Sequence, residues 1–112
     1  MREIRAGLLG ATGAVGQRYI HMLGHHPFIH LEVLMGGESA GKKYGEAAHW
    51  LFSDPIPEQF AKTTVQAASP TAAKGCDLIF SALPSEVAKD IEPKFAAAGH
   101  AVISEASAHR MA

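Results

Sequence analysis

The sequence RAGLLGATGAVG, residues 5–16, carries the strongest structural signal in this chain. Its first part, Arg5–Leu9, is a short and mostly apolar run that predicts a β-strand. A turn with three glycines follows, and from Val15 onwards apolar residues recur at the spacing of one helix face until Gly24 and Pro27 end the pattern. A strand, a glycine turn and a helix in immediate succession are typical of the phosphate-binding unit of a parallel α/β sheet.

Each glycine of this turn has a chemical reason to be there. Gly10 can adopt the tight turn that ends the strand, Gly13 lets a pyrophosphate approach the backbone, and Gly16 lets the helix pack close to the sheet. The N–H groups at the helix start then hold the anion, and Thr12 adds a hydroxyl. A purely structural glycine turn is the alternative interpretation. Because the turn lies between a strand and a helix, we predict that it binds a dinucleotide.

Four further segments follow the first helix. Leu31–Met35 is a second apolar strand, and Glu38–Pro57 lacks a clear period, so it predicts a long loop with one short helix around Trp50. A weak strand is expected at Thr63–Gln66. Asp77–Pro84 predicts another strand, because four of five consecutive residues are apolar before a proline ends it.

The C-terminal part predicts one more helix and one more strand. Ser85 is a suitable N-cap, and apolar residues recur at helical spacing up to Ala98. Pro93 lies inside this pattern and should kink or split the helix, and Gly99 should end it. The last strand is expected at His100–Ser104.

Strands that alternate with helices predict an α/β fold, a doubly wound parallel sheet covered on both faces. Residues 1–112 can form one domain at most, and we expect no internal boundary. The net charge of −1 gives no reason to expect a nucleic acid or a membrane as partner, and no apolar run reaches the length of a membrane span. With Cys76 as its single cysteine, the chain fits the reducing cytoplasm.

The residues after the second strand bear on which dinucleotide is bound. Glu38 lies where an acidic ribose ligand is usual, although a solvated loop carboxylate is the alternative. Ser39 and Lys42 suit a 2′-phosphate, whereas Lys42 and Lys43 could also form an exposed pair.

Other reactive side chains give weaker signals. Asp77 follows Cys76, so this thiol lacks the cationic neighbour of a nucleophile and is expected to be a small core or edge residue. His21, His25, His26 and His30 form two i,i+4 pairs, but glycine and proline interrupt the helix between them, so we expect no metal site.

Several motifs in the same order resemble aspartate-semialdehyde dehydrogenases of the archaeal and fungal type. They are LLGATGAVGQRYIHML (8–23), HHPFIHLEVL (25–34), SAGKKYGEA (39–47), Trp50, IPE (56–58), FSALPSEVAKDIEPKFAAAGHAVIS (80–104) and ASAHRM (106–111). The resemblance covers essentially the whole chain. It implies a Rossmann-type NAD(P)-binding domain that is truncated before a catalytic and dimerisation domain.

The resemblance also implies an activity for the parent enzyme, a homo-oligomeric oxidoreductase. Members reduce aspartyl phosphate to aspartate semialdehyde with NADPH, on the route to lysine, threonine and methionine. A Cys thiolate attacks the acyl phosphate, and a His acts as acid and base. Because both lie beyond this chain in the family, we expect no catalytic residue here, and the chain alone should be inactive. His109 and Arg110 match a family segment, with a solvated loop as the alternative.

The family's cofactor contacts carry over to matching positions of this sequence. They are Gly10, Thr12, Gly13, Ala14, Val15 and Gly16 in the turn, Ser39, Gly41 and Lys42 near the adenosine phosphate, Ser81, Ala82, Leu83 and Pro84 beneath the cofactor, and Ser104 and Ala106 near the nicotinamide.

The chain departs from the family pattern at two positions. Glu38 replaces an arginine that pairs with the 2′-phosphate, so NAD is possible beside NADP. Glu105 replaces an asparagine near the nicotinamide. Two alternatives stay open: another acyl-phosphate or thioester reductase, such as a malonyl-CoA reductase, and a non-catalytic nucleotide-binding module.

Overall fold

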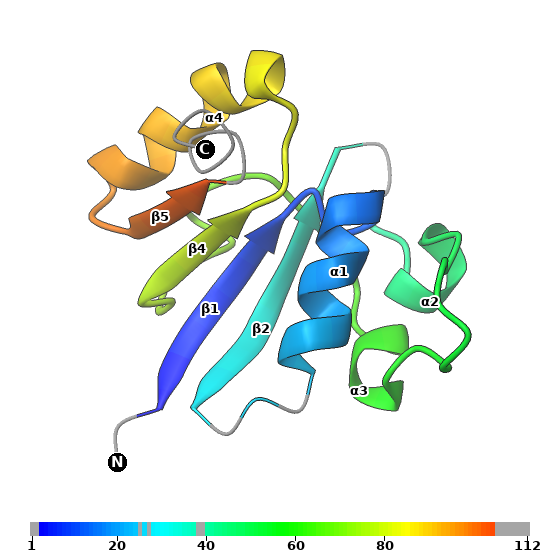
Figure 1. Ribbon diagram of the computed structural model, residues 1–112. Helices are drawn as coiled ribbons and strands as arrows, with labels where there is room; N and C mark the ends of the chain where they lie inside the picture. The colour runs from blue at the N-terminus through cyan, green and yellow to red at the C-terminus, as the bar shows by residue number, and fades with distance from the viewer. Residues whose placement is uncertain (1–2, 25, 27, 38–39, 105–112) are drawn as a thin grey trace, which may run out of the picture.

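The computed structural model describes residues 3–24, 26, 28–37 and 40–104. These residues form one five-stranded sheet with the order β3-β2-β1-β4-β5. Every pair of neighbouring strands is parallel. Figure 1 shows the twisted sheet with α1 over β1 and β2 and α4 beside β4 and β5. The expected doubly wound α/β sheet is therefore confirmed.

The first strand–turn–helix unit forms where the sequence predicts it. β1 spans Ile4–Leu9 and pairs with β2, which spans Ile29–Gly36. α1 spans Ala14–Leu23, and the amide of its C-cap residue Gly24 donates to the carbonyl of Ile20. The second strand is longer than expected because pairing with β1 adds Ile29 and His30 at its start, and pairing of Gly36 with Ala67 adds one residue at its end.

The connection between β2 and β4 corrects two predictions. Its helices are α2, Tyr44–Ala47, and α3, Glu58–Ala61, and no helix forms around Trp50. The backbone near Trp50 is bound instead by a side chain, because Gln17 contacts the His49 carbonyl and the Leu51 amide. These groups are therefore not available for helical hydrogen bonds.

The expected strand at Thr63–Gln66 is also displaced. β3 is only Gln66–Ala67, which pairs with Met35 and Gly36. The residues before it pair in the opposite direction with the Gly41–Tyr44 segment, through an antiparallel bridge between Lys43 and Thr64. The apolar pattern of residues 63–66 did not show which residues would pair with β2 and which with the Gly41–Tyr44 segment.

The C-terminal unit consists of β4, Leu78–Ser81, α4, Ser85–Ala97, and β5, Ala101–Ser104. The N-cap is Pro84 rather than the expected Ser85, which is the first helical residue. α4 is not split at Pro93, which is exposed, because the helix continues past this residue to Ala97. Ala98 is the C-cap, so the helix ends just before Gly99 as predicted.

Two apolar clusters hold the layers together. The first joins α1, α2 and α3 to one face of the sheet and includes Leu8, Ile20, Tyr44, Phe60 and Phe80. The second joins α4 to the opposite face and includes Leu9, Met35, Ile79, Cys76 and Phe95. Because both faces of β1 are buried from Ala6 to Leu9, this part of the strand is apolar without alternation.

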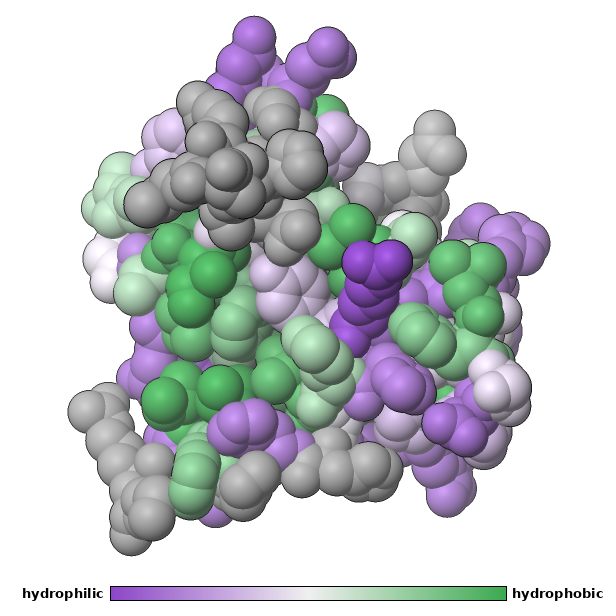
Figure 2. Space-filling model, in the orientation of Figure 1, coloured by the Kyte–Doolittle hydropathy of each residue, from purple (hydrophilic) through white to green (hydrophobic). Residues whose placement is uncertain are grey.

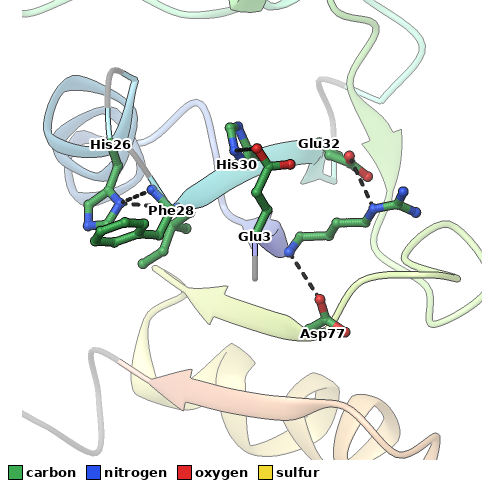
Figure 3. A network of polar contacts seen from close by, with 8 residues as sticks. Glu3, His26, Phe28, His30, Glu32 and Asp77 are labelled. Carbon is green, nitrogen blue, oxygen red and sulfur yellow. Dashed lines mark hydrogen bonds and ion pairs between the residues drawn. The ribbon is translucent and has the colours of Figure 1, made fainter. Parts of the chain in front are cut away.

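Polar contacts connect residues near the N-terminal ends of the strands, which Figure 3 shows from close by. The Arg5 amide donates to Asp77 over 3.1 Å, and the Arg5 guanidinium lies 3.7 Å from the Glu32 carboxylate. His26 accepts the Phe28 amide over 3.0 Å. These contacts lie at the opposite end of the strands from the glycine turn.

The histidines at this end of the strands have individual partners. The His26 ring also accepts the amide of Ile29, and His30 lies 3.4 Å from Glu3. Among the described residues no three His, Cys, Asp or Glu side chains gather as a metal site. Within the same residues, no helix combines the length and apolar character that crossing a membrane requires.

Candidate functional site: a cleft at the carboxyl ends of the strands

A crevice opens where the chain leaves β1 and β4. From β1 the chain crosses through α1 to β2, and from β4 it crosses through α4 to β5 on the other side. In open parallel sheets this reversal of direction creates the usual ligand-binding crevice. The predicted glycine turn follows β1 and therefore lies at this position.

The glycine turn is packed tightly against its surroundings. Gly10 has a φ of 73°, and a Cβ there would lie 3.3 Å from the Ala82 backbone. At Gly16 a Cβ would lie 2.1 Å from the Gly10 carbonyl oxygen. The start of α1 can therefore approach the turn only because residue 16 lacks a side chain.

Hydrogen bonds tie the turn to neighbouring strands. The amides of Gly10 and Ala11 both donate to the Met35 carbonyl, over 2.9 and 3.1 Å. On the other side, the Ala82 amide donates to the Leu9 carbonyl over 3.0 Å. The turn is thus held between β2 and the segment after β4.

Two buried side chains contact the turn from behind. The Tyr44 hydroxyl donates to the Ala11 carbonyl over 2.7 Å, and Gln17 Nε2 donates to the Thr12 carbonyl over 3.0 Å. Burial raises the pKa of Tyr44 far above its ordinary value. The phenol therefore stays protonated and able to donate at all ordinary pH values.

The cleft in front of the turn has a volume of about 540 Å³. This size lies within the range of about 300–1,000 Å³ that is usual for small-molecule sites. The residues that line it are Gly10, Thr12, Gly36, Gly37, Lys42, Glu46, Ala47, His49, Ala68, Leu83, Val87 and Ile91. Polar groups thus lie on the side of α2, and apolar side chains lie on the side of α4.

Backbone pairing fixes the position of Lys42 on the polar wall. The Lys42 carbonyl accepts the Val65 amide over 2.8 Å, and the neighbouring Gly41 amide donates to the Val65 carbonyl over 2.7 Å. The Tyr44 amide donates to the Thr63 carbonyl over 2.9 Å. A lysine ammonium in a cleft that also contains Glu46 and His49 can bind an anionic group.

A second polar group lies at the ends of β4 and β5. Ser81 is completely buried, and its hydroxyl has no hydrogen-bond partner among the described residues. Ser104 pairs with Ser81 in the sheet, and its hydroxyl donates to Glu92 of α4 over 2.7 Å. These serines lie at the carboxyl edge of the sheet but do not line the cleft.

The structure brings together only part of the predicted set of site residues. Gly10, Thr12, Lys42 and Leu83 line the cleft, and Gly41 adjoins Lys42. Gly13 is the N-cap of α1 and Ala14 its first residue, whereas Gly16 is buried behind the turn. Ala82 and Pro84 belong to the segment between β4 and α4. Val15 instead lines a separate hollow on α1 with Arg18, Tyr19 and Met22. Glu38, Ser39, Glu105, Ala106, His109 and Arg110 lie outside the described residues.

Sequence reasoning missed several residues of the site. Gln17 and Tyr44 lie inside the quoted motifs, but the sequence predicted no role for them, because that role depends on contacts to carbonyl groups. Glu46 and His49 belong to a segment without clear periodicity. Val87 and Ile91 belong to the apolar residues at helical spacing between Ser85 and Ala98, and the same spacing also indicates a cleft wall when the helix follows a switch point.

Cys76 does not belong to this cleft. It is buried in the second apolar cluster, and burial raises the pKa of its thiol. The nearby carboxylates of Glu32 and Asp77 raise this pKa further, while Arg5 lowers it. The thiol is thus a core residue, as the sequence predicts.

The chain matches known proteins over most of its length. The family model described as the NAD-binding domain of semialdehyde dehydrogenase matches residues 5–112. The chain is 48% identical over 107 residues to an aspartate-semialdehyde dehydrogenase of Archaeoglobus fulgidus, covering 95% of this chain and 31% of that protein. It is 40% identical over 109 residues to a malonyl-CoA reductase (NADP) of Metallosphaera sedula, covering 97% and 30%.

A solved structure shows the same fold. The aspartate-semialdehyde dehydrogenase of Candida albicans, crystallised with NADP, has a TM-score of 0.87 and 44% identity, and the match covers 91% of this chain and 29% of that one. The chain therefore spans about a third of the length of the relatives that it matches.

Proposed function

The chain belongs to the family of semialdehyde dehydrogenase NAD-binding domains, and from this premise we propose that it binds NADP(H) in the cleft at the glycine turn. The observation that carries the proposal is the position of the turn. It lies at the switch point of a doubly wound sheet, in front of a cleft of suitable volume.

The residues at the cleft fit a dinucleotide. Gly10 lines the cleft, and Gly13 leaves the backbone open at the start of α1, where amide groups and the helix dipole attract a pyrophosphate. Leu83, Val87 and Ile91 give an apolar wall for a flat ring. The bound nicotinamide would supply hydride, and the residues of this chain would bind and orient the cofactor.

We assign the 2′-phosphate of NADP to the wall that contains Lys42. Its backbone is fixed by pairing with Val65, so its ammonium group starts from a defined position. Glu38 and Ser39, which lie outside the described residues, bear on the same choice. Acidic Glu38 favours ribose hydroxyls and thus NAD, whereas Lys42 favours NADP.

For the longer enzyme we propose the reduction of aspartyl phosphate to aspartate semialdehyde. The relatives named for this activity include proteins 48% and 47% identical to the chain. We assign the catalytic Cys and His to the part of such an enzyme that lies beyond these residues, and we propose that the enzyme is a cytoplasmic homo-oligomer. A malonyl-CoA reductase activity is the second candidate, because a relative named for it is 40% identical.

Calorimetric titration with NADP and NAD tests the cofactor assignment. We expect tighter binding of NADP, and replacement of Lys42 in Lys42→Ala should reduce this preference about tenfold, since it removes a charge-assisted contact. Lys43→Ala is the matched control, because Lys43 does not line the cleft. Tighter binding of NAD would assign Glu38 to the ribose hydroxyls. Absence of binding of either dinucleotide would refute the proposal and favour a module with another partner.

A further inference from the structure

Two consecutive carbonyl groups of the glycine turn are held by buried donors. Tyr44, in α2, binds the Ala11 carbonyl, and Gln17, in α1, binds the Thr12 carbonyl. Tyr44 is completely buried, and only 2% of Gln17 is exposed. Neither side chain lines the cleft, so both act on the turn from within the protein.

The geometry of the peptide bond gives these contacts a consequence. In a trans peptide the carbonyl and the following amide point in opposite directions, so a fixed carbonyl also fixes that amide. The Ala11 carbonyl shares its peptide plane with the Thr12 amide, and the Thr12 carbonyl shares its plane with the Gly13 amide, which donates to the Gly10 carbonyl over 3.3 Å within the turn. A carbonyl that rotated towards a bound pyrophosphate would repel it, and the two donors oppose this rotation.

Gln17 also connects the turn to the opposite wall. Its Nε2 donates to the His49 carbonyl over 3.0 Å, and its Oε1 accepts the Leu51 amide over 2.9 Å. Because His49 lines the cleft, one amide side chain joins the glycine turn to this wall. Tyr44 likewise joins the turn to this wall, since it begins α2 two residues after Lys42.

We propose that Gln17 and Tyr44 are positioning residues that hold the glycine turn in its pyrophosphate-binding conformation and in register with the wall of Lys42 and His49. This proposal rests on the proposed binding of a dinucleotide. It goes beyond that function because it assigns pyrophosphate affinity to two side chains that do not line the cleft.

The variant Tyr44→Phe removes one hydroxyl and keeps the ring. We expect its affinity for NADP, measured by calorimetry on the 112-residue chain, to fall about three- to tenfold, as loss of one buried hydrogen bond would produce. Tyr19→Phe makes the same change on α1 away from the cleft and should bind NADP as the wild type does. Gln17→Glu, which loses both N–H donors at almost constant size, should bind more weakly than Tyr44→Phe.

Measurement well below the melting temperature of each variant separates positioning from stability. A purely structural role would lower the melting temperature and leave the affinity of the folded chain unchanged, and that result would overturn the proposal. Failure of the wild type to bind NADP would instead refute the proposed function.

A measurement without substitution covers the case in which the variants do not fold. The chain has only two tyrosines, so fluorotyrosine labelling gives two ¹⁹F resonances. Addition of NADP should shift the resonance of Tyr44 and leave that of Tyr19 in place. An unchanged Tyr44 resonance at saturating NADP would contradict the coupling between this side chain and the bound pyrophosphate.

Discussion

Gly16 and Gly13 belong to one turn but meet different physical constraints. A Cβ at Gly16 would collide with the Gly10 carbonyl at 2.1 Å, whereas the nearest contact at Gly13 would be 3.7 Å. The first glycine is therefore required by the fold itself. At Gly13 the protein itself has room for a side chain, so the absence of one leaves space for a ligand that approaches the turn.

Gly16→Ala should lower the free energy of unfolding by about 2 kcal/mol or more, because the added methyl group overlaps backbone atoms that cannot move independently. Urea denaturation measures this loss. Gly37→Ala is the control, since a Cβ there meets nothing within 4 Å, and we expect a change below about 0.5 kcal/mol. Equal effects of the two substitutions would show that α1 does not pack on the turn as described.

Tyr44 gives a prediction for the pH dependence of stability. Burial raises its pKa above the ordinary value of 10.0, so above pH 10 the phenol ionises in the unfolded chain while it stays neutral in the folded one. The unfolded state is then favoured, and stability that is present below pH 10 is lost as pH rises. Tyr44→Phe should lack this component, which chemical denaturation between pH 8 and pH 11 would reveal. Parallel pH curves for both proteins would be the contrary result.

Cys76 should react slowly with a thiol reagent in the native chain. Its side chain is buried and its pKa is raised, so both access and the thiolate fraction are low. Ellman titration at pH 8 should show rapid reaction only after denaturation. Rapid reaction of the native thiol would place it outside the second apolar cluster.

At the scale of elements, the sequence predicted what depends on local pattern. β1, α1 and β4 combine a strong hydrophobic period with glycine or proline boundaries, and the structure places them within a few residues of the expected ranges. The helix expected at Trp50 was wrong, because Gln17 binds the backbone of that segment from a distant helix. Local periodicity carries no signal for such a contact.

In the candidate site, too, some residues could be predicted from local sequence pattern, whereas others depend on distant contacts. Gly10, Thr12 and Lys42 belong to motifs, so their place at the cleft could be predicted. The roles of Tyr44 and His49 depend on how the connection between β2 and β4 folds back on α1. No single stretch of sequence encodes that arrangement.

For the whole molecule, the face of the sheet opposite α4 is covered unevenly. α1 packs over β1 and β2, whereas Ile103 in β5 is 46% exposed and pairs with Phe80 of β4. Figure 2 shows apolar surface on this side of the molecule, over the strands that α1 does not cover. On α1 itself, Met22 is 66% exposed. Apolar surface of this kind favours association.

We therefore expect the 112-residue chain to self-associate, and Ile103→Lys to weaken that association by placing a charge on the exposed face. Sedimentation velocity over a range of concentrations measures both. A wild-type chain that sediments as a monomer at every concentration would refute this expectation.

The central claim, that the glycine turn binds the pyrophosphate of a dinucleotide, is tested most directly by following the backbone amides of the ¹⁵N-labelled chain during titration with NADP. The account predicts saturable shifts that are largest at residues 10–17, with smaller shifts at Lys42 and Leu83, and their loss in Gly13→Ala. Saturable shifts confined to another part of the molecule, or none at millimolar NADP, would contradict it.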